Sequence, residues 1–408
     1  MGVDQDLKTE FYSMKKSFAG LCCLIILMAF QFSSLAQQDS AGRRRAIAVF
    51  VPLYLDSAFN TNGEYAYGKN FPKFLNPGLE FYQGIQLAAD SLSKTGAAMD
   101  VFVYDTRSPA NSFQKVLQKP EFSRVQLIIG YVSNNEIRPL AEIAKSRNIP
   151  FINANLPNDG GVNNNPSLVI LNSTLKTHLQ AIYNFLQKNY ATSPMVVFRT
   201  KSAQDEILKN YFTEIEKSTV SVPLKLKYIT LNKNFSSSQL AAYLDSTRVT
   251  MCIAGSLDDD FARQLSTQLA RLNETYPSQV MGMPNWDVSR ESDKKQYQGL
   301  EIFYSTPFYN AKTDKVSISI LNYFRNNQYS RPTEMLFRGY ECLIHFGKLL
   351  LEHGANLGSS IGAKKYKVFT DFDVQPVLLN KQSPTLDYFE NRKVYLVKMQ
   401  DGVVKGVY

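Results

Sequence analysis

Hydroxyl and amide side chains gather just after two neighbouring stretches, 125–130 and 149–152, that have the composition of buried strands. The residues that carry these groups are Tyr131, Ser133, Asn134, Asn153 and Asn155. A primary amide both donates and accepts hydrogen bonds, and the free N–H groups at a helix start attract polar or anionic groups. Ligands of open α/β sheets bind in the crevice beyond the carboxyl ends of the strands. The chemistry expected of these residues is therefore the binding of a small polar ligand.

The segment from Val125 to Asn155 supplies the elements that would position these side chains. An apolar, β-branched run ends at Gly130, as a buried parallel strand does. Ser133 is followed three residues later by Glu136, a capping-box pattern that starts a helix. The same pattern also fits an ordinary strand–helix–strand unit without a ligand, in which Glu136 already satisfies the helix start. The sequence leaves both interpretations open.

Two further candidates lie in the second half of the chain. Trp286, the only tryptophan, follows an expected strand at 279–283 and offers a ring for stacking on a sugar or base. Its alternative role is packing against the loop beneath it. Asp258 opens an expected helix at 258–273 and offers a carboxylate to a ligand ammonium group or a cation. An acidic residue also stabilises a helix start when no ligand is present.

Sequence motifs of catalysis are missing. The chain has no phosphate loop, no nucleophile-elbow serine, no zinc-binding pair at helical spacing and no cysteine cluster. His178, His345 and His353 lie far apart and are expected to pack or to face solvent. The sequence therefore predicts a protein that is not an enzyme and that needs neither a metal nor a cofactor.

The amino end has the pattern of a secretory signal peptide at 1–36. Lys15 and Lys16 precede an apolar run at 21–32, and Ser34-Leu35-Ala36 is a small-x-small cleavage site. The apolar run is too short for a stable membrane span. We therefore expect an exported, periplasmic protein that meets the membrane only through a partner, with a basic leader at 37–45.

Charge and cysteine content narrow the possible functions further. The 408 residues carry a formal charge of +9, but the basic residues are scattered apart from Arg43-Arg44-Arg45. No nucleic-acid groove is therefore predicted. The mature chain retains Cys252 and Cys342, which can form a disulfide in an exported protein. Two separate buried thiols are the favoured alternative, because small buried cysteines commonly pack as apolar side chains.

Strand and helix patterns alternate along the rest of the chain. Strands are expected at 46–52, 99–104, 195–198, 224–231, 249–254, 366–370 and 393–399, and helices at 173–190, 205–217 and 334–353. Asp401-Gly402 is a hairpin signal after the last of these strands. Strand–helix alternation is typical of parallel sheets with right-handed crossovers. So many units favour an α/β fold with two doubly wound parallel-sheet lobes joined by a hinge.

The order of several segments resembles the type I periplasmic binding proteins, in particular those that bind branched-chain amino acids for ABC transporters. The resembling segments are IAVFVPLYLDS, GLEFYQGIQLAADSLSKTG, VQLIIGYVSNNEIRPLAEIAKSRNIPFINAN, MCIAGSLDDDFARQL and NRKVYLVKMQDG. The resemblance implies two lobes that close on a ligand and are joined by three crossings near Leu171, Ser305 and Asp373. Lobe 1 would comprise 46–170 and 306–373, and lobe 2 would comprise 171–305 and 374–408.

The resemblance implies an extracytoplasmic solute-binding protein, which holds a small polar solute for an ABC transporter permease or a receptor. At positions where the amino-acid binders use hydroxyl residues, this chain has Ser133, Asn134 and Asn135. The loop 200–204 also lacks the aromatic residue and the glycine of those proteins, which argues against an α-amino acid as the ligand. The alternative is a non-catalytic envelope module that regulates cell-wall synthesis through contact with another protein.

Overall fold

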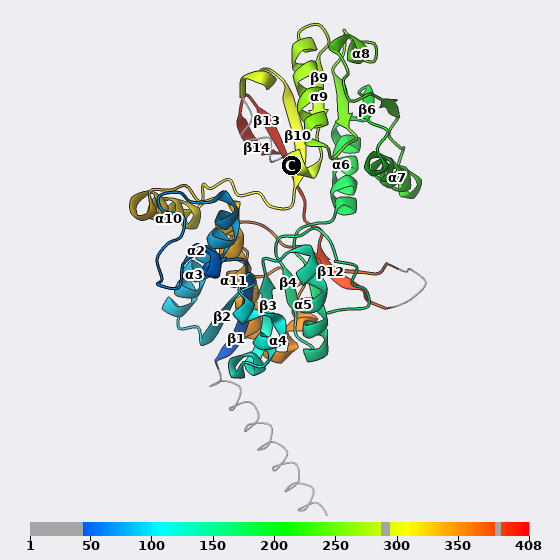
Figure 1. The fold of residues 1–408 in the computed structure, drawn as a ribbon. Helices are drawn as coiled ribbons and strands as arrows, with labels where there is room; N and C mark the ends of the chain where they lie inside the picture. The colour runs from blue at the N-terminus through cyan, green and yellow to red at the C-terminus, as the bar shows by residue number, and fades with distance from the viewer. Residues whose placement is uncertain (1–43, 287–293, 380–384, 408) are drawn as a thin grey trace, which may run out of the picture.

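The computed structural model describes residues 44–286, 294–379 and 385–407, and these form two lobes, each built around one sheet (Figure 1). The predicted signal peptide at 1–36 and the basic leader as far as residue 43 lie outside the described residues. Both sheets are dominated by parallel strands and covered by helices, which confirms the predicted α/β class with two doubly wound lobes. Within the described ranges, no helix is long and apolar enough to cross a membrane.

The sheet of lobe 1 has the strand order β11-β12-β5-β4-β3-β1-β2. Its strands are β1 (Arg45–Val51), β2 (Met99–Asp105), β3 (Val125–Gly130), β4 (Phe151–Asn153), β5 (Leu168–Ile170), β11 (Val374–Val377) and β12 (Tyr388–Asn391). Neighbouring strands pair in parallel, except β11 and β12 at one edge, which pair antiparallel. Strand β1 is apolar and buried from its second residue to its last, as expected for a strand covered on both faces.

The sheet of lobe 2 has the order β14-β13-β10-β9-β8-β6-β7. Its strands are β6 (Met195–Arg199), β7 (Leu226–Thr230), β8 (Thr250–Ala254), β9 (Ser278–Met281), β10 (Glu301–Thr306), β13 (Tyr395–Gln400) and β14 (Val403–Val407). Strands β13 and β14 form the predicted hairpin, whose turn residues Asp401 and Gly402 both have positive φ. The hairpin extends the sheet beyond β10, so the last segment of the chain belongs to lobe 2.

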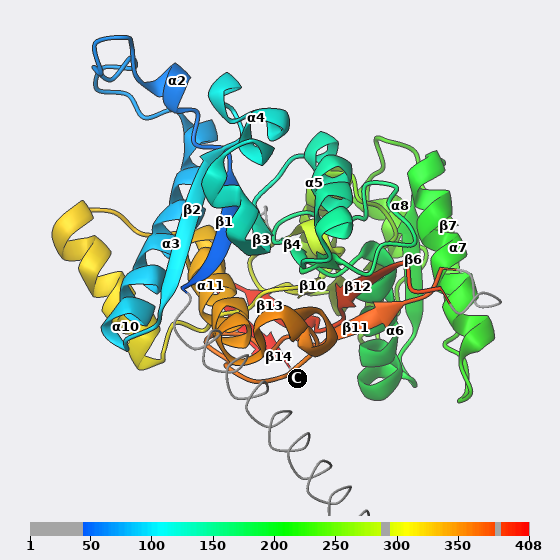
Figure 2. The ribbon, with the colours of Figure 1, turned by 90° about the horizontal axis from the view of Figure 1, so that it is seen from below.

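Helices cover both sheets (Figure 2). The helices of lobe 1 are α2 (Leu55–Ala58), α3 (Asn76–Lys94), α4 (Phe113–Leu117), α5 (Asn134–Arg147), α10 (Lys315–Tyr323) and α11 (Glu334–His353). Those of lobe 2 are α6 (Leu175–Tyr190), α7 (Ala203–Ser218), α8 (Ser237–Ala241) and α9 (Asp259–Leu272). Glycines let the backbones of α3 and α11 meet: a Cβ atom added to Gly84 would lie 2.0 Å from the carbonyl oxygen of Leu336. One added to Gly339 would lie 2.2 Å from the carbonyl oxygen of Phe81.

Helix α5 starts as the sequence predicts. The capping box is formed, and the Glu136 carboxylate accepts a hydrogen bond of 2.7 Å from the backbone N–H of Ser133. At the other end, Asn148 has a φ of 52°, a left-handed conformation that asparagine tolerates and that stops the helix. The helix is therefore fixed at both ends by local signals, and its amino end is held next to strand β3.

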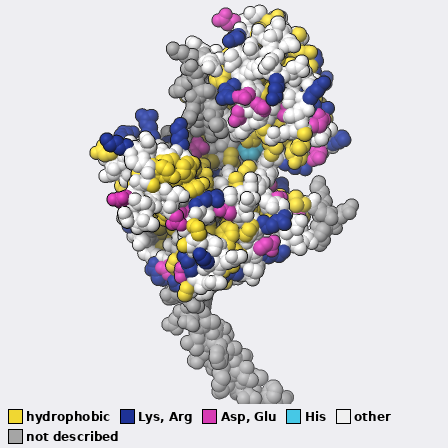
Figure 3. Space-filling model, viewed as in Figure 1, with side chains coloured by type: hydrophobic (Ala, Val, Ile, Leu, Met, Phe, Trp, Pro, Cys, Tyr) yellow, Lys and Arg dark blue, Asp and Glu magenta, His cyan; other side chains and the backbone are white. Residues whose placement is uncertain are grey.

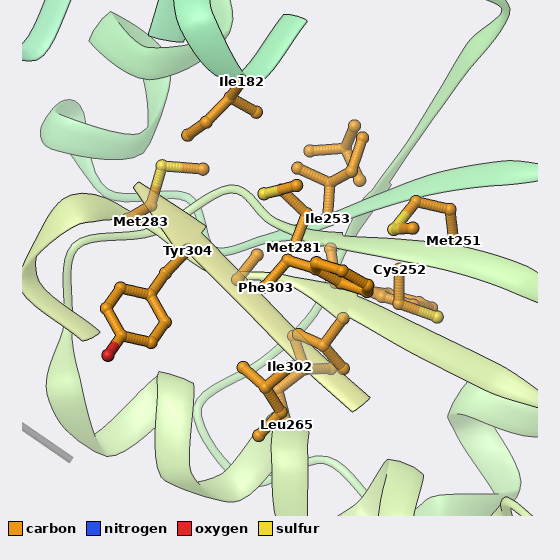
Figure 4. Close-up of a cluster of buried hydrophobic side chains, with 14 of the residues drawn as sticks. Ile182, Met251, Cys252, Ile253, Leu265, Met281, Met283, Ile302, Phe303 and Tyr304 are labelled. Carbon is orange, nitrogen blue, oxygen red and sulfur yellow. The ribbon is translucent and has the colours of Figure 1, made fainter. Parts of the chain in front are cut away.

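The core of lobe 2 is distinct from the cores of lobe 1 and lies on both faces of its sheet. Figure 4 shows Ile182 of α6 above the strands and Leu265 of α9 on the opposite side. Cys252 belongs to this core, whereas Cys342 is buried in lobe 1, and both are free thiols. Burial raises the pKa of each thiol because it penalises the thiolate. The favoured expectation of two buried thiols is confirmed, and the disulfide alternative is wrong.

Two expectations about the last part of lobe 1 are wrong. The segment 366–370 is irregular rather than a strand, because its aromatic side chains pack on α11: the Phe369 ring lies 5.3 Å from that of Phe337. Strands β11 and β12 then extend the sheet of lobe 1, with β12 parallel to β5. The third crossing therefore lies at 392–394, after Asn391, and not near Asp373, so residues 374–391 belong to lobe 1.

Candidate ligand-binding site

The carboxyl ends of the parallel strands of both sheets face the junction of the lobes (Figure 1). In lobe 1 the strand order reverses at β1, which lies between β2 and β3, and in lobe 2 it reverses at β6, which lies between β7 and β8. Connections leave the sheet in opposite directions at such a switch point, which opens a crevice where ligands bind. The candidate site therefore consists of the loops after β1 and β3 and the loops after β6 and β8.

Three of the predicted residues follow β3 and lie at the switch point of lobe 1. Tyr131 is half-buried, and burial together with the neighbouring Tyr54 raises the pKa of its hydroxyl. The hydroxyl therefore stays protonated at neutral pH and is able to donate a hydrogen bond. Ser133 caps α5, and Asn134 is exposed at the first position of that helix. Tyr131, Ser133 and Asn134 therefore all lie at the carboxyl end of β3, at the switch point of lobe 1.

The side-chain amides of Asn153, at the end of β4, and Asn155, just after it, form hydrogen bonds within the protein. Asn153 is fully buried; its Oδ1 accepts from the N–H of Leu156 at 3.1 Å and its Nδ2 donates to the carbonyl of Leu156 at 3.0 Å. The amide of Asn155 pairs with both backbone groups of Val132, at 2.8 Å each. These two residues therefore stabilise the loops after β3 and β4. Both amides are already hydrogen-bonded within lobe 1.

Asp258 and Trp286 lie in lobe 2, and they differ in exposure. Asp258 follows β8 at the switch point and is exposed, while its Oδ1 caps α9 by accepting from the N–H of Phe261 at 2.9 Å. Trp286 is only 3% exposed and packs on Gly282, where an added Cβ would lie 2.4 Å from the indole ring. The structure therefore places Trp286 in the core, in agreement with its packing alternative, and leaves Asp258 at the crevice.

Sequence reasoning missed a charged group in lobe 1, Arg107. Its guanidinium lies over the Tyr54 ring, 5.7 Å from the ring centre, and its Nη1 is 3.4 Å from the Glu136 carboxylate. Buried Asp105 holds both neighbouring loops, because its carboxylate accepts backbone N–H groups of Leu53 and Arg107 at 2.8 and 2.9 Å. The position of Arg107 could have identified it. Arg107 follows the carboxyl end of β2 as Tyr131 follows that of β3, and ligands bind beyond the carboxyl ends of such strands.

The segment 54–75, between β1 and α3, forms an aromatic rim beside Arg107. Its rings contact each other in series, from Tyr54 to Phe74 at 5.0 Å, to Tyr67 at 6.3 Å and to Tyr65 at 5.8 Å. Tyr54 has a φ of 57°, which is unusual for an aromatic residue and is held by the hydrogen bond from its N–H to Asp105. The loop is therefore fixed in a conformation that keeps Tyr54 next to Arg107.

Three crossings join the lobes, at 171–174, 307–314 and 392–394, and hydrogen bonds tie them together. Ser173 in the first crossing donates to the carbonyl of Asn391 at 2.7 Å, and Asn391 Nδ2 donates to the carbonyl of Leu171 at 3.0 Å. Glu390 of lobe 1 accepts from the N–H of Thr174 at 2.8 Å, next to the start of α6 in lobe 2. The Ser173 hydroxyl also donates to the carbonyl of Lys393 in the third crossing at 3.2 Å, so the first and third crossings are hydrogen-bonded to each other.

The second crossing joins these two through a buried arginine. Arg338 in α11 lies over the ring of Phe308 in the second crossing, 5.1 Å from the ring centre. It also donates to the side chain of Asn172 in the first crossing and pairs with buried Glu341 at 3.2 Å. The hinge is therefore organised around one ion pair inside lobe 1.

A buried histidine close to the hinge makes stability depend on pH. His178 of α6 lies 2.9 Å from Ser305 of β10, and burial lowers the pKa of its imidazole to about 3. The unfolded chain binds a proton near pH 6.5, whereas the folded chain does not, so stability is present above about pH 6.5 and is lost on acidification. We expect His178 to contribute a loss of about 2 kcal/mol between about pH 7 and about pH 5.

The matched variant is His178→Gln, because glutamine keeps a hydrogen-bonding group for Ser305 and does not titrate. Urea unfolding of both proteins across this pH range measures the difference. The stability of the variant should fall less steeply with acidification than that of the wild type. Parallel curves would show that folding does not lower the pKa of His178.

The described residues contain no group of three or more His, Cys, Asp or Glu side chains placed to hold a metal ion. On the face shown in Figure 3, basic and acidic side chains are interspersed, and the outline narrows where the two lobes meet. The polar groups at the crevice are thus hydroxyls, amides, the Arg107 guanidinium and carboxylates, which suit hydrogen bonding to a polar solute.

Neither a protein-family model nor a curated protein sequence matches this chain. Solved structures do match it. A leucine-binding protein from Thermotoga maritima is 15% identical, with 89% of this chain and 98% of that chain covered and a TM-score of 0.50. An ABC transporter substrate-binding protein from Desulfitobacterium hafniense in complex with Leu is 14% identical, with 90% and 100% covered and a TM-score of 0.54.

A third similar structure is a branched-chain amino acid ABC transporter periplasmic ligand-binding protein from Burkholderia xenovorans. It is 13% identical, with 90% of this chain and 95% of that chain covered and a TM-score of 0.58. The matches cover 89–90% of this chain, and at this low identity they show the fold. This chain therefore has the two-lobe fold of these similar structures.

Proposed function

We propose that this protein is an extracytoplasmic solute-binding protein that holds a small polar ligand between its two lobes. One observation carries the proposal: the carboxyl ends of both sheets, each with a switch point, face the same junction, and the two lobes are joined by three short crossings. Such an arrangement lets a ligand contact both lobes at once, and hinged lobes of this kind close around their ligands. The similar structures are binding proteins of ABC transporters, one of them solved with Leu.

The groups at the crevice favour a ligand with both hydrogen-bonding and charged parts. Lobe 1 offers the Tyr131 hydroxyl, the Asn134 amide and the Arg107 guanidinium, whose side chain is 32% exposed. Lobe 2 offers Asp258 after β8. An anionic part of the ligand would meet Arg107, and a cationic part would meet Asp258, because charge-assisted hydrogen bonds are the strongest available there.

The remaining parts of the proposal concern the cell. In this role the protein binds its solute without catalysing a reaction. It is released into the periplasm after removal of residues 1–36, and it delivers the solute to a transporter permease. The exported location follows from the signal-peptide pattern at the amino end. The alternative, an envelope module that contacts another protein, requires no small ligand and is separated from this proposal by the experiment below.

A thermal-shift screen of amino acids, sugars, nucleosides and organic acids tests the proposal. We expect at least one class to raise the melting temperature, because a ligand that binds only the folded state stabilises it. For that ligand, Arg107→Gln should raise the Kd about tenfold or more, the value of one lost charge-assisted hydrogen bond.

Arg124→Gln is the matched control for this experiment. Arg124 is an exposed arginine of the same lobe that directly precedes β3, at the opposite edge of the sheet from Arg107, and it pairs with Asp100 at 3.2 Å. The control should bind like the wild type. A screen without any shift, or an equal loss of affinity in both variants, would contradict the proposed site.

A further inference from the structure

A groove with a volume of about 340 Å³ opens on lobe 1, away from the loops of the candidate site. Four lysines border it, namely Lys364, Lys365, Lys367 and Lys393, and His345 of α11 lines its buried end. The segment 361–373 that carries the first three lysines runs beside α11 (Figure 2), while Lys393 belongs to the third crossing. The groove therefore lies where lobe 1 meets the hinge, and its volume is in the range of small-molecule sites.

Three of the lysines are paired with carboxylates, but at exposed positions. Lys364 pairs with Asp373 at 2.6 Å and Lys367 pairs with Asp371 at 2.9 Å, and the lysine side chains are 65% and 56% exposed. Lys365 pairs with Glu352 at 2.6 Å in the same way. Exposed pairs of this kind contribute little stability, and because Asp371 and Asp373 also line the groove, an incoming anion would compete with their carboxylates for the lysines.

Lys393 has no carboxylate within ion-pair distance in the part of the chain that the structure describes. Its ammonium group lies over the Tyr395 ring, 4.9 Å from the ring centre. Arg392, the neighbouring residue, adds positive charge: the pKa of Asp373 is lowered by hydrogen bonds from Lys364 and Gln375 and by attraction to Lys364 and Arg392. The groove therefore keeps an excess of positive charge after its internal ion pairs are counted.

His345 supplies a polar group at the bottom of the groove. The residue is 2% exposed, and neither ring nitrogen makes a hydrogen bond of good geometry within the described structure, although backbone groups of Lys365 and Tyr366 lie close to the ring. The rings of Phe346 and Phe372 lie 4.7 and 4.8 Å from it and fix its orientation. Burial lowers the pKa of His345 to about 4, against an opposing effect of the nearby backbone groups of Tyr366 and Lys365, so the imidazole is neutral at neutral pH and carries one N–H, for which an anion would compete with these groups.

We propose that this groove binds a phosphoryl group, carried either by inorganic phosphate or by a phosphate ester. Lysine ammonium groups act as point charges without the planar fork of arginine, and several of them surround a tetrahedral oxyanion more readily than they match a planar carboxylate. Lys393 would approach the anion from the crossing, the lysines of 364–367 from lobe 1, and the His345 N–H from below. A bound anion would thus touch the hinge and lobe 1 together.

Isothermal titration calorimetry of the purified protein with inorganic phosphate and with glycerol 3-phosphate tests the proposal. We expect binding at low ionic strength that weakens as salt is added, because screening acts on exposed charges. Lys393→Gln and Lys367→Gln should each raise the Kd for phosphate about tenfold, as expected for the loss of one charge-assisted hydrogen bond. His345→Phe, which keeps the ring shape and removes the donor, should weaken binding as well.

Lys233→Gln is the control, because Lys233 is an exposed lysine in the loop between β7 and α8 of lobe 2. Tighter binding of glycerol 3-phosphate than of phosphate would identify a phosphate ester as the ligand class, and the reverse order would identify free phosphate. The proposal is overturned by the absence of binding in the wild type, or by lysine variants that bind like Lys233→Gln. Loss of phosphate binding in Arg107→Gln alone would assign the anion to the interlobe site instead.

Discussion

Replacing Gly84 by alanine is expected to lower the free energy of unfolding of lobe 1 by about 3 kcal/mol, the upper part of the range for overpacking. The new Cβ would lie 2.0 Å from the carbonyl oxygen of Leu336 and 2.7 Å from the backbone nitrogen of Tyr340. Both neighbours are backbone atoms of α11, so neither moves away without displacing the helix. The gain in helix propensity, about 1 kcal/mol, offsets only part of this cost.

Urea unfolding followed by circular dichroism measures this change, and Gly358→Ala is the matched control. Gly358 lies just after α11 with no atom within 4 Å of the added Cβ, so its replacement should change stability by less than about 0.5 kcal/mol. Fluorescence of Trp286 reports on lobe 2, whose core is separate, and should respond less than the signal of lobe 1. Equal stability of Gly84→Ala and Gly358→Ala would mean that α3 and α11 are not closely packed.

Replacing Arg338 by methionine is expected to destabilise the protein by about 3–5 kcal/mol, the cost of leaving a buried charge without its partner. Arg338 and Glu341 are 2% and 0% exposed, and their side chains lie 3.2 Å apart. The substitution also removes the contacts of Arg338 with Asn172 and Phe308, which link the first two crossings. The hinge should therefore lose rigidity together with stability.

The pH dependence of this loss identifies its cause. Burial raises the pKa of Glu341, and Arg338 opposes that rise, so removing Arg338 raises the pKa further. A carboxyl group with a raised folded-state pKa contributes stability at low pH that is lost as pH rises through that value. The difference between Arg338→Met and the wild type should consequently grow from acidic to neutral pH.

A double variant completes the test of the ion pair. Arg338→Met combined with Glu341→Gln removes both charges, while the glutamine keeps hydrogen-bonding groups for Thr370, which donates to Glu341 at 2.8 Å. The double variant should therefore recover a large part of the stability lost in the single variant. If it is as unstable as Arg338→Met, the loss comes from the contacts of Arg338 with the crossings and not from the buried charge.

Hinge rigidity also matters for the proposed function. Lobes that close on a ligand need crossings that bend at few positions. The hydrogen bonds of Ser173, Asn391 and Arg338 restrict this bending to short segments. A variant that loosens these contacts should weaken ligand binding even where it touches no ligand, because more disorder is then lost on closure. Comparing Arg338→Met with the wild type in the ligand titration measures that effect.

Sequence patterns were sufficient wherever the structure depends on near neighbours along the chain. The capping box of Ser133 and Glu136, the buried run before Gly130 and the turn at Asp401-Gly402 are all decided within a few residues. Alternation of such units then implies parallel sheets, which is why the two-lobe α/β fold was predictable. Tyr131, Ser133 and Asn134 were predicted to follow a strand end, and Asp258 to start a helix, for the same reason.

Positions that depend on distant partners were decided only by the tertiary structure. Asn155 resembled a ligand-binding residue, but its amide is used by Val132, 23 residues earlier in the chain. Trp286 is buried in a core with residues from distant segments such as Phe198 and Tyr304, and Arg107 lies over the ring of Tyr54, which is 53 residues earlier. The third crossing lies after Asn391, later than predicted, because β12 pairs with β5, more than 200 residues away.

The sequence by itself therefore determined the elements, their class and the edge of each sheet where a ligand is expected, because these follow from local periodicity and capping. The tertiary structure decided which polar groups at that edge remain available and which are consumed by the protein, because hydrogen bonds between distant segments have no signature in a local pattern. It also brought Lys393 beside the lysines of 364–367, since only folding places the end of β12 next to the segment that follows α11.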